Sequence, residues 1–113
     1  MNNEEQLEGE GAAAQADAEY QQWMSEQTLH VLYFSAPWCG PCKMFGPAFD
    51  EIVAEFDNID VHKINIDETP EAARTYEVVS IPTIIMEKGG VQVFRHKGVM
   101  PKTHLKDVIK ANL

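Results

Sequence analysis

The chain of 113 residues is long enough for one domain, and its composition, 44% hydrophobic and 24% charged residues, is typical of a globular protein. The formal net charge is −9, and residues 1–28 hold seven acids and no base, which argues against nucleic acid or an anionic membrane as a direct partner. No apolar run approaches the ~20 residues of a membrane span, and the N-terminus lacks the basic and apolar segments of a signal peptide, so we expect a cytoplasmic protein.

The first part of the chain predicts a tail followed by a helix. Residues 1–11 are polar and acidic, which predicts a disordered acidic tail ahead of a single domain at residues 12–113. Residues 12–27 are rich in helix formers and predict a docked helix. Three of its apolar side chains can share one face: Tyr20, Trp23 and Met24.

The next segments predict a strand, a long helix and a second strand. The apolar run at residues 29–34 is typical of a buried strand. Apolar side chains spaced by three and four predict a helix over residues 39–56, with Pro47 inside it. Residues 60–66 then predict another strand. Because a long helix joins the two strands, we expect them to be parallel.

The last part predicts a short helix, a hairpin and a final helix. In "TPEAARTY", Thr69 is the expected N-cap and Pro70 the first helical residue. Two apolar runs at residues 83–87 and 91–96 flank the turn signal "KGG" and predict an antiparallel hairpin. A last helix begins at Pro101. The order of elements predicts an α/β fold, a mixed sheet with helices on both faces.

Both cysteines of the chain lie in "SAPWCGPCKM", where the first strand meets the long helix. Cys39 is expected at the helix N-terminus, whose free N–H groups and dipole stabilise a thiolate. Cys42 lies one turn later on the same face, near enough to close a small disulfide ring. Such a pair can attack a substrate disulfide and then resolve the mixed disulfide. We expect Cys39 to be the more acidic and the more exposed thiol.

Two other interpretations of the cysteines are weaker. A structural zinc site needs four ligands, but the chain has two cysteines, and no paired ligand spacing is visible among its histidines: His30, His62, His96 and His104. We therefore expect no metal, and we interpret the histidines as surface or strand side chains without a catalytic role. A structural disulfide across two residues would give the smallest entropic gain.

The motif resembles the active site of the thioredoxin family. "WCGPCK" is followed in the family's order by "HKINID", "SIPT" and "KGG" and then by Gly98, so the resemblance covers residues 29–113. It implies a thioredoxin-like fold and an enzyme that reduces protein disulfides, with no bound cofactor beyond a redox-active Cys39–Cys42 disulfide. It also implies client proteins with disulfides, a reductase that recharges the pair, and a monomer that binds neither nucleic acid nor membrane.

The resemblance also implies roles for individual residues. Cys39 would be the nucleophile, Cys42 the resolving thiol, and Pro82 a cis-proline that faces the disulfide. The residues implied to support the active site are Trp38, Gly40, Pro41, Lys63, Tyr33 and Pro82. Those implied to meet an extended substrate segment are Ile81, Val79, Gly98 and Val99. An apolar collar for partners could consist of Val79, Ile81, Val99 and Met100, or these could be ordinary core and surface residues.

One position departs from the family's pattern, and the departure affects a second residue that matches it. Tyr33 stands where most thioredoxins have a buried aspartate, and a phenol cannot serve as a ready base at neutral pH. Lys63 resembles the family's semi-buried lysine and would lose its carboxylate partner, so we expect it to reach water, to bond the Tyr33 hydroxyl or to become neutral.

The family's usual first strand also has no visible counterpart, so we expect a sheet of four strands. A second function remains open, in which the chain is a thioredoxin-like binding subunit of a partner protein and its redox cycling is incidental.

Overall fold

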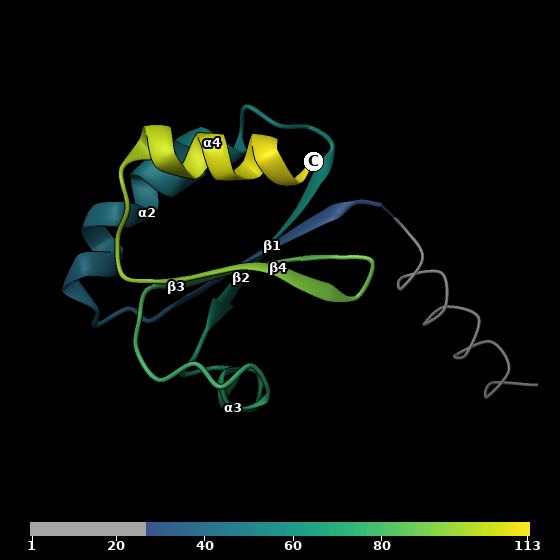
Figure 1. Cartoon of the computed structure of the whole chain (residues 1–113). Helices are drawn as coiled ribbons and strands as arrows, with labels where there is room; N and C mark the ends of the chain where they lie inside the picture. The colour runs from purple at the N-terminus through teal and green to yellow at the C-terminus, as the bar shows by residue number, and fades with distance from the viewer. Residues whose placement is uncertain (1–26) are drawn as a thin grey trace, which may run out of the picture.

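The computed structural model describes residues 27–113. They form a mixed sheet in the order β2-β1-β3-β4, with α2 and α4 on one face and α3 on the other (Figure 1). The predicted fold class is thereby confirmed. The expected acidic tail, the helix at residues 12–27 and the question of an earlier strand lie outside the described residues.

Strand β1 (Leu29–Ser35) forms the middle of the core. It pairs with β2 (Ile59–Asn65) in parallel and with β3 (Thr83–Lys88) in antiparallel. Because successive side chains of a strand alternate between faces, one set joins the core beneath α2 and α4, and the other joins the smaller core beneath α3. Burial on both faces explains why β1 is apolar from Leu29 to Phe34 except at His30.

Helix α2 (Gly40–Val53) is three residues shorter than expected at its C-terminal end and begins one residue after Cys39, which is its N-cap. Its buried face consists of Cys42, Phe45, Phe49 and Ile52. Pro47 lies within the helix, as expected. Phe56 lies beyond the helix but still packs against the main core.

Helix α4 (Lys102–Asn112) lies beside α2 (Figure 1). Its Leu105 and Ile109 are fully buried, and Lys102 pairs with Glu51 of α2 at 3.1 Å. Pro101 is the N-cap rather than the first helical residue. Helix α3 (Pro70–Thr75) is preceded by Thr69 in the N-cap position, but the Thr69 side chain makes no capping hydrogen bond.

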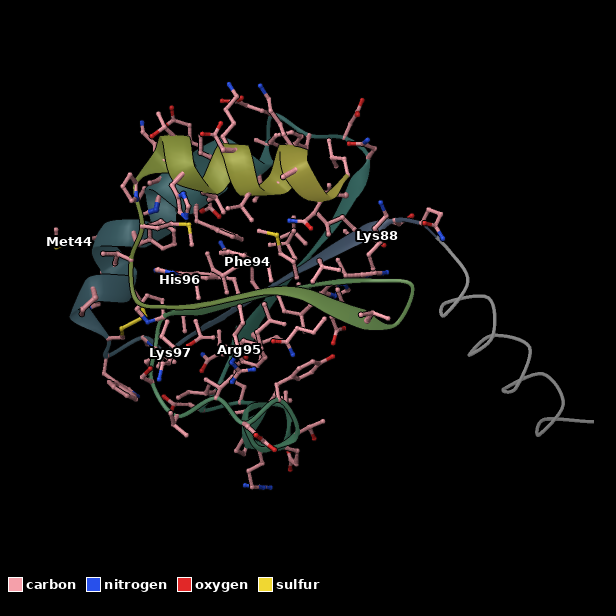
Figure 2. The ribbon with its side chains drawn as sticks, in the orientation of Figure 1. Met44, Lys88, Phe94, Arg95, His96 and Lys97 are labelled. Carbon is pink, nitrogen blue, oxygen red and sulfur yellow. A yellow bond between two sulfur atoms is a disulfide. The ribbon has the colours of Figure 1, made fainter. Side chains whose placement is uncertain are left out.

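The hairpin of β3 and β4 (Val91–Lys97) turns at two glycines with positive φ, Gly89 at 59° and Gly90 at 79°. Two successive residues with positive φ are typical of a tight hairpin turn. Along β4, Phe94 and His96 lie on the side of α4, and Arg95 and Lys97 lie on the side of α3 (Figure 2).

His30 in β1 and His62 in β2 are strand side chains, which is one of the two expected alternatives. His30 is only 5% exposed. Its Nδ1 lies 3.1 Å from Nε2 of His62 in β2, although the two residues are 32 positions apart. The sequence spacing gave no sign of this pair, because the register of two parallel strands creates it.

Candidate active site

The two cysteines lie where β1 ends and α2 begins. They form a disulfide, and their Cα atoms are 5.2 Å apart, a normal separation for this bond. The Sγ atom of Cys39 accepts a hydrogen bond of 3.2 Å from the backbone N–H of Cys42. Cys39 thereby caps the helix. Pro41 lies in the first turn, where a backbone N–H would have no carbonyl partner within the helix, so its missing N–H costs little.

The expectation that Cys39 is the more exposed thiol concerns the reduced protein and stays a prediction; in the disulfide form both cysteines are buried. Cys39 is 4% exposed and Cys42 is 6% exposed, because both pack against Ala36, Ile66 and Ile81. What distinguishes the two sulfurs is their electrostatic position: only Cys39 Sγ accepts an N–H at the helix N-terminus.

The Ile81–Pro82 peptide bond is cis, and the segment lies against the disulfide. The carbonyl oxygen of Ile81 is 3.8 Å from Cys39 Sγ. The N–H of Gly98 donates to the Pro82 carbonyl at 2.7 Å, which ties the end of β4 to this segment. Gly98 has a φ of 94°, and a Cβ there would meet nothing within 4 Å. Backbone conformation, not crowding inside the molecule, therefore explains this glycine.

Trp38 is 66% exposed beside the disulfide. Its Nε1 donates to the Asp67 carboxylate, with 3.0 Å to Oδ2. Asn65 in turn accepts the N–H of Asp67 through Oδ1 at 2.9 Å. The sequence analysis missed Asp67, although it follows β2 at the same sheet edge at which β1 delivers Trp38.

Apolar side chains surround the disulfide, with one exception to the expected collar. Val79 is 83% exposed and Val99 is 52% exposed, whereas Met100 is only 6% exposed because it packs into the main core. Met44 on α2, which was not expected, is 83% exposed and projects outward from the helix (Figure 2). A hollow of about 310 Å³ has the following lining: Trp38, Ile66, Val78, Val79, Ser80 and Ile81.

A cleft of about 290 Å³ lies behind the disulfide, and its lining includes Cys42, Tyr33, Lys63 and Asn65. The Tyr33 ring is buried and stacks on Phe49 with 4.4 Å between ring centroids. Its hydroxyl donates to the Cys42 carbonyl at 3.4 Å. Burial, and secondarily the charge of Asp50, raise the pKa of Tyr33, so this phenol stays neutral at physiological pH.

Lys63 differs from expectation in two respects. Its side chain is 53% exposed rather than semi-buried, and it has a carboxylate partner, since its Nζ lies 2.7 Å from Oδ1 of Asp50. The reason is that β2 is an edge strand and that Asp50 lies on α2 near the same edge. Lys63 reaches water, which is one of the three alternatives expected from the sequence.

Residues 27–113 contain no group of three or more His, Cys, Asp or Glu side chains placed to hold a metal ion. No helix within the same range is long and apolar enough to cross a membrane.

Comparison with known proteins agrees with this site. Residues 11–111 match the thioredoxin family model. The chain is 42% identical to Thioredoxin 1 of Synechococcus elongatus over 104 residues, which cover 90% of this chain and 97% of the relative. It is 40% identical to the thioredoxin of Staphylococcus aureus over 89 residues, which cover 78% of this chain and 86% of the relative.

Solved structures give the same result. The crystal structure of a thioredoxin from Nicotiana alata has a TM-score of 0.75 and 30% identity, and covers 89% of this chain and 87% of its own. Fasciola hepatica thioredoxin has a TM-score of 0.74 and 31% identity, with 88% and 94% covered. The chain therefore belongs to the thioredoxin family and is a thiol–disulfide oxidoreductase that reduces protein disulfides through Cys39 and Cys42.

Proposed function

We propose that Cys39 is the attacking nucleophile of the reduced protein and that Cys42 is the resolving thiol. One observation carries the assignment: Cys39 Sγ is the N-cap of α2 and accepts the N–H of Cys42. After reduction, the same N–H and the positive end of the helix dipole stabilise a thiolate on Cys39. Within residues 27–113, Cys42 Sγ accepts no comparable N–H, so its proton is held more tightly.

The exchange then takes two steps. The Cys39 thiolate attacks one sulfur of a client disulfide, a Cys39–client bond forms, and the second client sulfur leaves as a thiolate that takes a proton from water. The Cys42 thiolate next attacks Cys39 Sγ, which closes the Cys39–Cys42 disulfide and releases the first client sulfur. The client gains two electrons, and the protein loses two.

The proton of Cys42 leaves through the cleft behind the disulfide. Water in this cleft is its acceptor, because the neutral Tyr33 phenol cannot take a proton. Lys63 lines the same cleft, and its positive charge favours an anionic sulfur. Asp50, the partner of Lys63, partly offsets that effect.

The client segment binds in an extended conformation against the backbone of Ile81, beside Pro82. The exposed side chains of Val79 and Val99 and the ring of Trp38 contact apolar client residues. Gly98, with its φ of 94°, has no side chain, so the adjacent surface stays free. The absence of any Cβ contact within 4 Å at Gly98 supports an open approach for the client backbone.

The remaining properties follow the same proposal. The working unit is a monomer of residues 12–113 with an acidic tail at residues 1–11, and it acts in the cytoplasm. A thioredoxin-reductase-like donor recharges the Cys39–Cys42 disulfide, and no cofactor stays bound. A role as a binding subunit with incidental redox chemistry is not favoured, because a pure binder does not need both thiols.

An insulin reduction assay with dithiothreitol as the donor tests the activity. The wild type should accelerate precipitation of the insulin B chain, and the Cys39→Ser/Cys42→Ser variant should not. Brief alkylation of the reduced protein at neutral pH followed by peptide mapping tests the assignment: Cys39 should be labelled first. Preferential labelling of Cys42 would reverse the two roles without affecting the proposed activity.

A further inference from the structure

The sheet face beneath α3 carries a row of ionisable side chains at the end of β1 that is opposite to the disulfide. His30 of β1 is in register with Glu87 of β3 and with Asp60 of β2. His62 follows Asp60 by two residues and therefore lies on the same face of β2. This face is the one on which α3 packs (Figure 1).

Two members of this row are withdrawn from water, whereas Asp60 and His62 are exposed. His30 is 5% exposed and Glu87 is 9% exposed. The carboxylate of Glu87 accepts the Tyr76 hydroxyl at 3.2 Å. A hollow of about 330 Å³ opens beside the row and is lined in part by both histidines, Tyr76 and Glu87, so protons can reach the imidazoles from solvent.

The two imidazole rings are in direct contact. Nδ1 of His30 and Nε2 of His62 are 3.1 Å apart, and the ring centroids are 5.3 Å apart in a stacked arrangement. Oδ2 of Asp60 is 3.7 Å from the same Nδ1. The ionisable groups that face the pair are thus Asp60 on β2, Glu87 on β3 and Tyr76, the C-cap of α3.

A hydrogen bond between two imidazole nitrogens needs one nitrogen with a proton and one without. The bond therefore persists while at least one ring is neutral. When both rings are protonated, two N–H groups with like charges face each other, and the bond is lost. We propose that His30 and His62 form a proton-controlled contact between β1 and β2, closed when at least one ring is neutral and open when both are protonated.

The contact matters because β2 is an edge strand, and β1 is its one partner strand within residues 27–113. The same strand ends at Asn65, which positions Asp67 and through it Trp38. Opening of the contact would therefore loosen the strand that supports one side of the redox site.

The direction of the pH effect follows from proton counting. In the unfolded chain both imidazoles take up protons freely near pH ~6.5, whereas the closed contact admits only one. Below that pH the unfolded state binds one more proton, so stability falls as the pH falls, and the opening constant rises by up to about tenfold per pH unit.

The test is amide hydrogen exchange of β2 between pH 5.5 and 7.5, corrected for intrinsic rates, in wild type, His62→Gln and His104→Gln. His62 is exposed, so the glutamine is tolerated, and His104 is a matched exposed histidine on α4. In the wild type and in His104→Gln, the opening constant of β2 should rise about fivefold or more from pH 7.5 to 5.5. In His62→Gln it should change less than about twofold. An equal pH dependence in all three proteins, or none in the wild type, would overturn the proposal.

Ring resonances of the histidines give a second measurement that needs no variant. In the wild type the His30 and His62 signals should titrate in two coupled steps, and the second step should coincide with loss of protection in β2. Independent single-step titration of both rings at the same pH as in the unfolded chain would also overturn the proposal.

Discussion

At the scale of single residues, Tyr33 most distinguishes this site from the thioredoxin pattern. Its ring fills the space between β1 and α2 through contacts with Phe45 and Phe49. Its hydroxyl donates to the backbone carbonyl of Cys42 rather than to a sulfur atom. The residue therefore packs the region behind Cys42 but supplies no base.

Tyr33→Asp should speed the resolution step at neutral pH and weaken the fold. An unassisted thiol is only about 3% ionised at pH 7, so resolution by the wild type should rise steeply with pH, whereas an aspartate can accept the Cys42 proton. The lost ring and the buried carboxyl should cost about 3–5 kcal/mol of unfolding free energy. Stopped-flow decay of a preformed mixed disulfide between pH 6 and 9 measures the rates. Tyr33→Phe is the control, and identical pH-independent rates in all three proteins would exclude a proton-transfer effect of this position.

Tyr33 also predicts an alkaline loss of stability. Burial, and then the charge of Asp50, raise the pKa of Tyr33 in the folded protein. A raised folded pKa means that the stabilisation is complete below the unfolded value of ~10 and is lost as the pH rises above it. Urea denaturation between pH 8 and 11 should show a shallower decline for Tyr33→Phe than for the wild type. Equal slopes would mean that ionisation of Tyr33 is not linked to unfolding.

Glu77, which follows α3, has a positive φ of 55° without being glycine. A side chain costs energy in this conformation. The backbone carbonyl of Glu77 accepts a hydrogen bond from Arg95 at 2.7 Å, and this bond does not depend on the Glu77 side chain. Glu77→Gly should therefore raise the unfolding free energy by about 0.5–1 kcal/mol. Thermal or urea unfolding checks this, with Glu77→Ala as the control that removes the carboxylate but keeps the Cβ. A gain of the same size in Glu77→Ala would assign the effect to charge.

The sequence could predict those site residues whose role depends only on their neighbours along the chain. The cysteine pair and the helix that begins after it follow from neighbouring residues. The Lys63–Asp50 pair, the Trp38–Asp67 bond and the burial of Met100 depend on which elements the fold brings together. The spacing along the chain contains no information about those contacts.

At the scale of elements, α4 is held by its buried face. Leu105 has no exposed surface and belongs to the core that α2 and the sheet share. Leu105→Ala should lower the unfolding free energy by about 2–5 kcal/mol, because the cavity that it leaves cannot fully close. Urea denaturation measures the change, and Lys110→Ala on the exposed side of the same helix should shift it by no more than about 0.5 kcal/mol. A small effect of Leu105→Ala would mean that α4 is not docked through this side chain.

The elements themselves were largely predictable because their patterns are strong. The apolar run of β1 predicts a buried strand, and the apolar positions of α2, spaced by three and four residues, predict a helix. The ends were less predictable: α2 stops at Val53, although apolar residues continue to Phe56. Phe56 reaches the core from a turn, and a pattern of apolar positions does not distinguish a turn from a further helical residue.

At the scale of the whole molecule, charge is divided unevenly along the chain. Seven of the eighteen acids precede residue 29, and all nine Lys and Arg follow it. Deletion of residues 1–11, which have no apolar face, should leave both the melting temperature and insulin reduction nearly unchanged. Calorimetry and the turbidity assay measure the two. Deletion of the same length from α4 is the destabilising control, and a large loss of activity after the N-terminal deletion would show that the segment takes part in catalysis.

The central place of β1 in the sheet has a consequence for synthesis on the ribosome. β1 is the first strand described, yet one of its two partners, β3, ends at Lys88, 53 residues after β1 ends at Ser35. At roughly 5–20 residues per second, translation needs roughly 3–10 s to cover that distance. For most of this interval both cysteines have already been made, while the core that will bury them does not yet exist. The nascent chain therefore exposes two thiols and a hydrophobic strand together, and a reducing environment during translation protects the future redox centre from premature pairing with other thiols.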